Sequence, residues 1–303
     1  ISLRLVGSEM CIRDSLQRSS AAETVESLRQ EQRSLLDLAG EGPFDYINSV
    51  GVLHHLDQPQ AGLQSLAGLL SPDGLLHLFL YADAGRWEIH RTQSALTLLD
   101  VGTGSEGLRL GRELIETLPE GNRLARNHRE RWAIDCAADA NFADMYLHPQ
   151  ETSYDLASLF SLIEGAGLRF AGFSNPEVWD PARLLQGELL DRARALPMRD
   201  QWALVEQLDP DISHFEFFLS AAPVRTRDWS DQELGAATGV RQPCLWGEPD
   251  PILGRNMEPI QLSDEARRLL QMLAETPDVP LGRLADVALI RDLVDRDLIL
   301  LRG

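Results

Sequence analysis

The feature that most constrains the fold is a strand, helix and strand pattern between residues 44 and 81. Residues 44–53, FDYINSVGVL, are mostly apolar, which is typical of a buried parallel strand. Residues 60–70 have the apolar spacing of an amphipathic helix, SPDG at 71–74 has the composition of a turn, and residues 75–81 form a second apolar run. Two strands joined by a helix make a βαβ unit, so the pattern predicts a parallel sheet and an α/β fold.

Helices and strands also alternate after this unit. Residues 86–147 are typical of several helices joined by polar loops. Beyond them we expect two more strands with flanking helices: a helix at 156–166 closed by Gly167, a strand at 168–173, a helical stretch at 181–208 interrupted near Pro197, and a strand at 214–219.

The C-terminal part divides at a proline-rich stretch. Five prolines between residues 223 and 261 predict a linker or loose arm. Residues 262–303 predict a small helical, winged-helix-like module, in which four apolar residues share one helix face: Ala266, Leu269, Leu270 and Leu273. This module has 8 acidic and 6 basic residues, which argues against DNA binding, so we expect it to pack or to contact a protein.

The N-terminal residues have the sequence of a cloning by-product. Residues 4–15 resemble a translated transposase adapter from sequencing-library preparation, with Leu5–Ser15 matching it residue for residue. We therefore treat residues 1–15 as adapter-derived and exclude them from the fold. The expectation is that native sequence begins near Leu16 and is truncated at its N-terminus.

The charge balance excludes several classes of partner. There are 47 acidic and 28 basic residues, a formal net charge of −19, which argues against a nucleic-acid or anionic membrane surface. No stretch approaches the roughly 20 apolar residues of a membrane span. The three cysteines, Cys11, Cys136 and Cys244, are too far apart for a disulfide framework or a zinc knuckle. We expect no metal and a cytoplasmic location.

Three consecutive blocks carry a resemblance to a known family. FDYINSVGVLHHL, the helix at 60–70 and LSPDGLLHLFLY resemble the fourth strand, connecting helix and fifth strand of class I S-adenosylmethionine-dependent methyltransferases. AGLRFAGF and HFEFFLS are similar to the sixth and seventh strands. The resemblance implies a Rossmann-like sheet that lacks its first strands, in a partial methyltransferase domain at 16–222 with a helical insertion at about 86–150. It does not reach residues 223–303.

The resemblance also assigns residues to S-adenosylmethionine, the cofactor it implies. Ser49, Val50 and Gly51 end the strand at the methionine half of the cofactor, because ligands of such sheets bind at the carboxyl ends of strands. Ser34 and Leu35 are similar to the segment that grips the adenine. The family often has an acidic residue where Ser34 stands, and a plain turn is the alternative interpretation.

The family's glycine-rich loop is missing before residue 44, so we interpret the chain as an inactive fragment. LDVGTGSEG at 99–107 resembles that loop, which leaves a circularly permuted enzyme as an alternative. The loop needs a strand before it and a second strand after its helix. The polar, basic stretch RLARNHRERW follows instead, so we interpret Gly102–Gly107 as a false match.

His54 and His55 follow the predicted strand and are candidate catalytic residues, because histidine is a suitable general base near neutral pH. A structural role at a helix entry is the alternative. Arg86, Tyr146 and His148 are candidate substrate-binding residues, with a salt bridge of Arg86 to Glu88 or a nearby helix, and simple packing of Tyr146 and His148, as alternatives.

Two further features have structural interpretations. The basic run at 123–131 is expected to be a solvated helix face, and Cys136 a buried apolar residue. The sequence thus predicts methyl transfer from S-adenosylmethionine to a small-molecule or protein acceptor. The alternative is a non-catalytic scaffold of the same fold that binds a protein partner.

Overall fold

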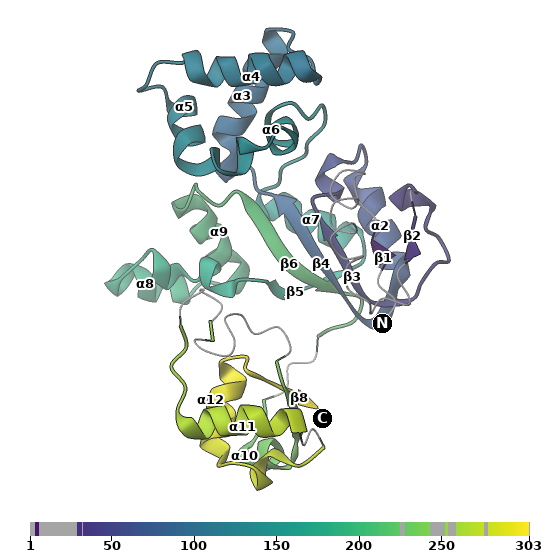
Figure 1. Ribbon diagram of the computed structural model, residues 1–303, viewed down its shortest axis with the longest axis vertical. Helices are drawn as coiled ribbons and strands as arrows, with labels where there is room; N and C mark the ends of the chain where they lie inside the picture. Colours follow the sequence, from purple (N-terminus) through teal and green to yellow (C-terminus); the bar gives the residue numbers. More distant parts are fainter. Residues whose placement is uncertain are drawn as a thin grey trace. The chain divides into compact units, whose positions relative to one another are not determined.

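The computed structural model describes residues 4–5, 29–31, 33–224, 228–242, 252–253, 259–275 and 278–302. The chain forms two compact units, residues 1–224 and residues 225–303, and each is described by itself. The first unit contains the predicted βαβ pattern and a bundle of helices (Figure 1). No helix in the described residues is both long enough and apolar enough to cross a membrane.

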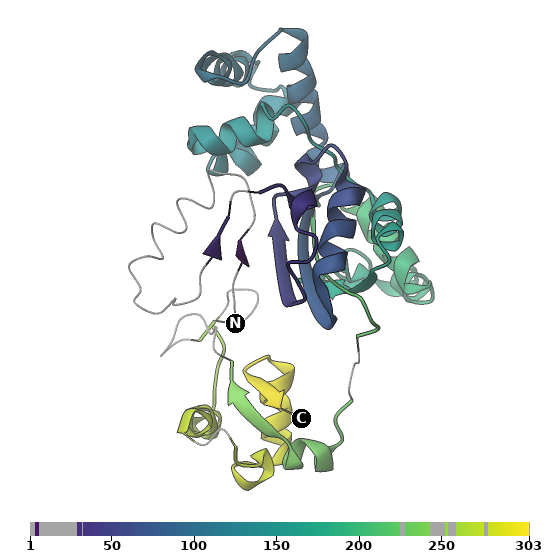
Figure 2. The same cartoon turned by 90° about the vertical axis from the view of Figure 1, so that its right-hand side faces the viewer.

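A four-stranded sheet in the order β3-β4-β6-β5 forms the centre of the first unit. β3 (Phe44–Val50) is parallel to β4 (Leu70–Tyr81), and α2 (Pro59–Leu69) joins them, which confirms the βαβ unit. β6 (His214–Ser220) is antiparallel to both β4 and β5 (Arg169–Phe173). Figure 2 shows β3 and β4 side by side beneath α2. The predicted α/β class is confirmed.

The end of the first strand and the turn before the second strand differ from the sequence prediction. β3 ends at Val50 and is less buried than expected, with Tyr46 53% and Val50 50% exposed, because it pairs only with β4 among the described strands. The expected turn at 71–74 belongs to β4. Phe44 pairs with Leu70 but Tyr46 pairs with Leu75, so the turn-forming residues make an irregularity within the strand.

One face of the sheet is buried against helices. Leu76, Leu78 and Leu80 alternate along β4 and are fully buried, as the period of a strand requires. They join a core with residues of α2, α7 (Leu156–Gly165) and β6. The remaining elements of this sheet region are η1 (Leu35–Asp37), η2 (Leu53–His55), η6 (Pro176–Trp179), η7 (Pro181–Arg183), α8 (Gly187–Arg194) and α9 (Met198–Leu208). A pair of two-residue parallel strands, β1 (Arg4–Leu5) and β2 (Arg29–Gln30), completes the described part.

Helices occupy residues 84–146, the region of the predicted insertion, and have a core of their own. The insertion comprises η3 (Ala84–Arg86), α3 (Trp87–Leu98), α4 (Ser105–Thr117), α5 (Arg123–Asn127), the π-helix η4 (His128–Trp132), η5 (Asp135–Ala137) and α6 (Asp139–Tyr146). Cys136 lies in this core, and burial raises the pKa of its thiol to about 11, as expected for a structural cysteine. In the basic run, Arg123 pairs with Glu88 and Arg131 with Asp211.

The glycine-rich stretch at 102–107 lies between α3 and α4. A helix therefore precedes it where a nucleotide-binding loop needs a strand. The structure confirms that the sequence match is false, and it removes the circularly permuted alternative.

The second unit is larger than the predicted helical module. It contains α10 (Asp231–Ala236), β7 (Thr238–Arg241), α11 (Asp264–Glu275), η8 (Leu281–Arg283), α12 (Val287–Asp295) and β8 (Ile299–Arg302). All four residues of the predicted helix face are buried in its core. The linker prediction for 223–261 is wrong where α10 and β7 lie, because β7 pairs with β8 from the far end of the unit. Pro243, Pro249 and Pro251 lie outside the described residues.

Candidate active site

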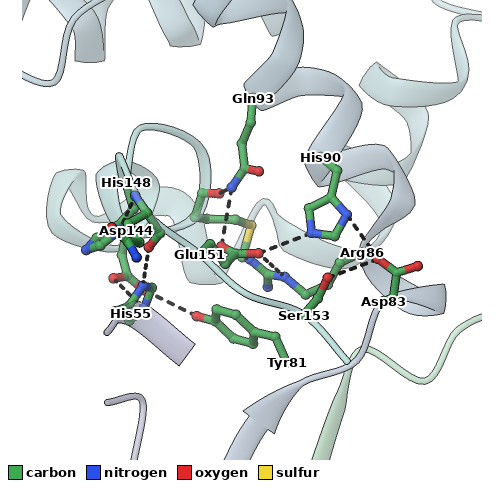
Figure 3. Close-up of polar contacts among 12 residues, drawn as sticks. His55, Tyr81, Asp83, Arg86, His90, Gln93, Asp144, His148, Glu151 and Ser153 are labelled. Carbon is green, nitrogen blue, oxygen red and sulfur yellow. Dashed lines mark hydrogen bonds and ion pairs between the residues drawn. The ribbon is translucent and has the colours of Figure 1, made fainter. Parts of the chain in front are cut away.

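Four segments meet at the carboxyl ends of β3 and β4 (Figure 3). η2 follows β3, η3 and α3 follow β4, and the connection between α6 and α7 returns along the same edge. Two backbone hydrogen bonds fix this connection at the edge. Thr152 N–H donates to the carbonyl of His54 at 2.8 Å, and Tyr154 N–H donates to the carbonyl of Tyr81 at 2.9 Å. The insertion therefore begins and ends at the sheet edge where α/β proteins bind ligands.

Gly51 leaves open space at the end of β3. Its φ is +71°, a conformation that favours glycine, and a Cβ built there meets no atom within 4 Å among the described residues. Ser49 is buried beside it and Val50 is half exposed. This geometry fits the predicted approach of the cofactor's methionine end to the backbone, although the assignment of these three residues stays a prediction.

Ser34 and Leu35 use their side chains in the fold. The Ser34 hydroxyl accepts a hydrogen bond from Leu36 N at 3.2 Å and caps η1. The side chain of Leu35 is buried in the main core. These contacts favour the plain-turn interpretation of both side chains, and the predicted adenine contact stays a prediction.

His54 is buried, so a methyl acceptor that enters from solvent cannot pass a proton to its ring. Its ring stacks on Tyr81 with centroids 3.8 Å apart, and neither ring nitrogen has a hydrogen-bond partner among the described residues. Burial lowers the pKa of His54 to about 3, so the ring is neutral at physiological pH. The prediction of His54 as a general base is therefore wrong for this structure.

His55 remains as the candidate base, and it lies in a group of polar side chains. Its Nδ1 is 3.0 Å from the carbonyl oxygen of Gln150, and its Nε2 is 3.8 Å from Oδ1 of Asp144. The hydroxyl of Tyr81 donates to Oδ2 of Asp144 at 3.4 Å, and the ring of His148 lies 4.0 Å from that of His55. We name these four residues, His55, Tyr81, Asp144 and His148, the edge cluster.

Arg86 is committed to a buried ion pair. It is 2% exposed and donates two hydrogen bonds to Glu151, at 2.9 and 2.7 Å, while its guanidinium lies 3.5 Å from the centre of the Tyr81 ring. Burial disfavours the charge of Glu151, but hydrogen bonds and attraction from His90 and Arg86 outweigh it and lower its pKa to about 2. Arg86 therefore positions the insertion, and its role as a substrate-binding residue stays a prediction. The expected salt bridge exists, with Glu151 as partner in place of Glu88.

The remaining predicted residue, Tyr146, also packs. It is buried in the insertion, where its hydroxyl lies 2.9 Å from Nδ1 of His128. Sequence reasoning missed Tyr81, Asp144 and Glu151. The position of Tyr81 as the last residue of a strand at the ligand-binding edge was an available signal for it, whereas the other two lie in the insertion. In the described residues, no group of three His, Cys, Asp or Glu side chains is arranged to hold a metal ion.

Comparison with known proteins decides the family. A family model described as a methyltransferase domain matches residues 8–76. An uncharacterized protein of Synechococcus sp., syc1184_c, is 42% identical over 300 residues, covering 94% of this chain and 71% of that protein. This chain therefore belongs to the same family as the Synechococcus protein and contains a match to a methyltransferase domain. The family match begins inside the segment interpreted as adapter-derived, and that interpretation stays a prediction.

Solved structures agree with the fold of this methyltransferase. PKMT2 from Rickettsia typhi, solved in complex with AdoHcy, has a TM-score of 0.60 at 15% identity and covers 95% of this chain. A second structure of PKMT2 has a TM-score of 0.59 at 15% identity, over 98% of this chain. The methyltransferase chain spans 64–65% of the length of these two PKMT2 chains.

Proposed function

We propose that this methyltransferase binds S-adenosylmethionine at the carboxyl end of β3 and transfers its methyl group to a small-molecule or protein acceptor. One observation carries the proposal: the open backbone at Gly51 adjoins η2, whose last residue, His55, belongs to a cluster that holds a base and a carboxylate. The binding of AdoHcy by the structurally similar PKMT2 supports the choice of cofactor.

The roles of the residues follow from their contacts. Bound S-adenosylmethionine supplies an electrophilic methyl group on a positively charged sulfur. Val50 and Gly51 would hold its methionine end, because their backbone is open at the end of β3. His55 would take the proton of the acceptor. The ion pair of Arg86 and Glu151 would keep the insertion in place, since correct alignment supplies much of the rate in such transfers.

Matched glycine substitutions test the cofactor site. Gly51 and Gly167 share a φ of +71° and open surroundings, so alanine at either position imposes a similar backbone strain. S-adenosylmethionine at 100 times its Kd should stabilise the wild-type protein by about 2.7 kcal/mol. The Gly51→Ala variant should lose most of this stabilisation, and Gly167→Ala should keep it.

The readout is the melting temperature with and without the cofactor, measured by calorimetry. Absence of any shift for the wild type at saturating cofactor would refute the proposed function and favour a non-catalytic scaffold. Equal shifts for both glycine variants would refute the location of the site.

A further inference from the structure

The hydrogen bond of His55 to the backbone determines which of its nitrogens is free. The Gln150 carbonyl oxygen, 3.0 Å from Nδ1, can only accept a hydrogen bond. Nδ1 must therefore carry a hydrogen. In the neutral ring this leaves the lone pair on Nε2, the nitrogen that faces Asp144.

Asp144 presents a second acceptor next to this lone pair. Its Oδ2 accepts from the Tyr81 hydroxyl, while its Oδ1 lies 3.8 Å from Nε2 of His55. This distance exceeds that of a hydrogen bond, and in the neutral ring both atoms are acceptors that cannot satisfy each other. The Asp144 side chain is 53% exposed, so a molecule from solvent can reach the pair.

We propose that the methyl acceptor is an amine, bound between Nε2 of His55 and Oδ1 of Asp144. The nitrogen of a primary amine or its ammonium ion carries at least two hydrogens and can donate to both acceptors at once, whereas a hydroxyl or thiol has only one. The local charge agrees, since three carboxylates, Asp83, Asp144 and Glu151, and one arginine, Arg86, are labelled in Figure 3. This inference rests on the proposed function and adds the class of substrate.

The geometry gives each residue a step in the transfer. The ammonium group of the acceptor passes one proton to Nε2 of His55 and becomes a neutral amine with a lone pair. That lone pair forms the new nitrogen–carbon bond while the carbon–sulfur bond breaks, and the bonding electrons go to the sulfur. The methylated nitrogen is then positively charged, and the Asp144 carboxylate stabilises this charge.

Binding of a simple amine tests the inference without any methyl transfer. The probe is n-butylammonium chloride, with n-butanol as the matched compound that lacks the extra hydrogens and the charge. Titrations of the full chain labelled with nitrogen-15 in histidine should shift the Nε2 resonance of His55 with the amine and leave it unchanged with the alcohol. Asp144→Asn should raise the Kd for the amine about tenfold, because a hydrogen bond to a charged group is lost.

Asp135→Asn is the control, since Asp135 is an exposed carboxylate of the same insertion outside Figure 3. It should leave the Kd unchanged. Equal binding of n-butanol and the amine, or an unchanged Kd in Asp144→Asn, would overturn the inference. The calorimetric shift with S-adenosylmethionine is independent of these titrations. A cofactor shift without amine binding therefore rejects the amine alone, and amine binding without a cofactor shift rejects the proposed methyl transfer.

Discussion

At the scale of single residues, His54 and His55 show how neighbours in sequence acquire different chemistry. The sequence identified both histidines as candidate bases but did not indicate which of them is better suited to that role. Their surroundings come from distant segments: Tyr81 covers the ring of His54, and the Gln150 carbonyl orients that of His55. Such contacts between residues far apart in the chain leave no local pattern. The open backbone of Gly51, in contrast, agrees with the sequence prediction, because glycine at a strand end leaves room for close approach, while its contact with the cofactor stays a prediction.

Burial of His54 predicts a specific pH dependence of stability. Its pKa is lowered from 6.5 to about 3 on folding, so below pH 6.5 the unfolded state binds a proton that the native state does not. The resulting loss of stability begins below pH 6.5 and grows until the pH reaches about 3. Between pH 7 and 4.5 it should amount to roughly 3 kcal/mol, at 1.36 kcal/mol per pKa unit.

The variant His54→Leu removes this contribution together with two buried, unpartnered nitrogens. Urea unfolding at pH 7 and pH 4.5 measures it. The variant should be at least as stable as the wild type at pH 7 and should gain on it by the stated amount at pH 4.5. A difference in stability that does not change with pH would show that His54 is solvated or partnered.

At the scale of elements, the helical insertion is tied to the sheet at both of its ends. Arg86 precedes α3 and Glu151 follows α6, so their ion pair closes the base of the insertion. Helical periodicity predicted the helices themselves, since it is a local property. It did not predict this pair, whose members are 65 residues apart. The turn composition of 71–74 makes an irregularity inside β4 and does not end the strand, because Leu70 and Leu75 on either side of it both pair with β3.

Glu151→Gln should destabilise the first unit by about 3–5 kcal/mol, because it leaves the buried charge of Arg86 without its counterion. Glu113→Gln is the matched control, since Glu113 pairs with Arg109 on an exposed helix face, and it should cost less than about 0.5 kcal/mol. Urea unfolding followed by circular dichroism at pH 7 compares the two. Similar losses in both variants would contradict a structural role of the buried pair.

At the scale of the whole molecule, the predictable part was the βαβ unit and its resemblance to methyltransferases. The extent of the second unit was not predictable in the same way, because β7 is a four-residue strand that exists by pairing with β8, about 60 residues later. The proline-rich composition of the surrounding segment predicts a linker where this strand lies. The proposed cofactor site lies at residues 49–55 and not at the glycine-rich match at 102–107.

Ultraviolet cross-linking of labelled S-adenosylmethionine tests this central claim most directly. Trypsin cleaves after Arg33, Arg86, Arg91 and Arg109, so residues 34–86 and 92–109 yield separate peptides that mass spectrometry distinguishes. We predict that the label is found in the peptide 34–86, centred on residues 49–55, and is absent from 92–109. Label in 92–109, or no label in 34–86, would contradict the account.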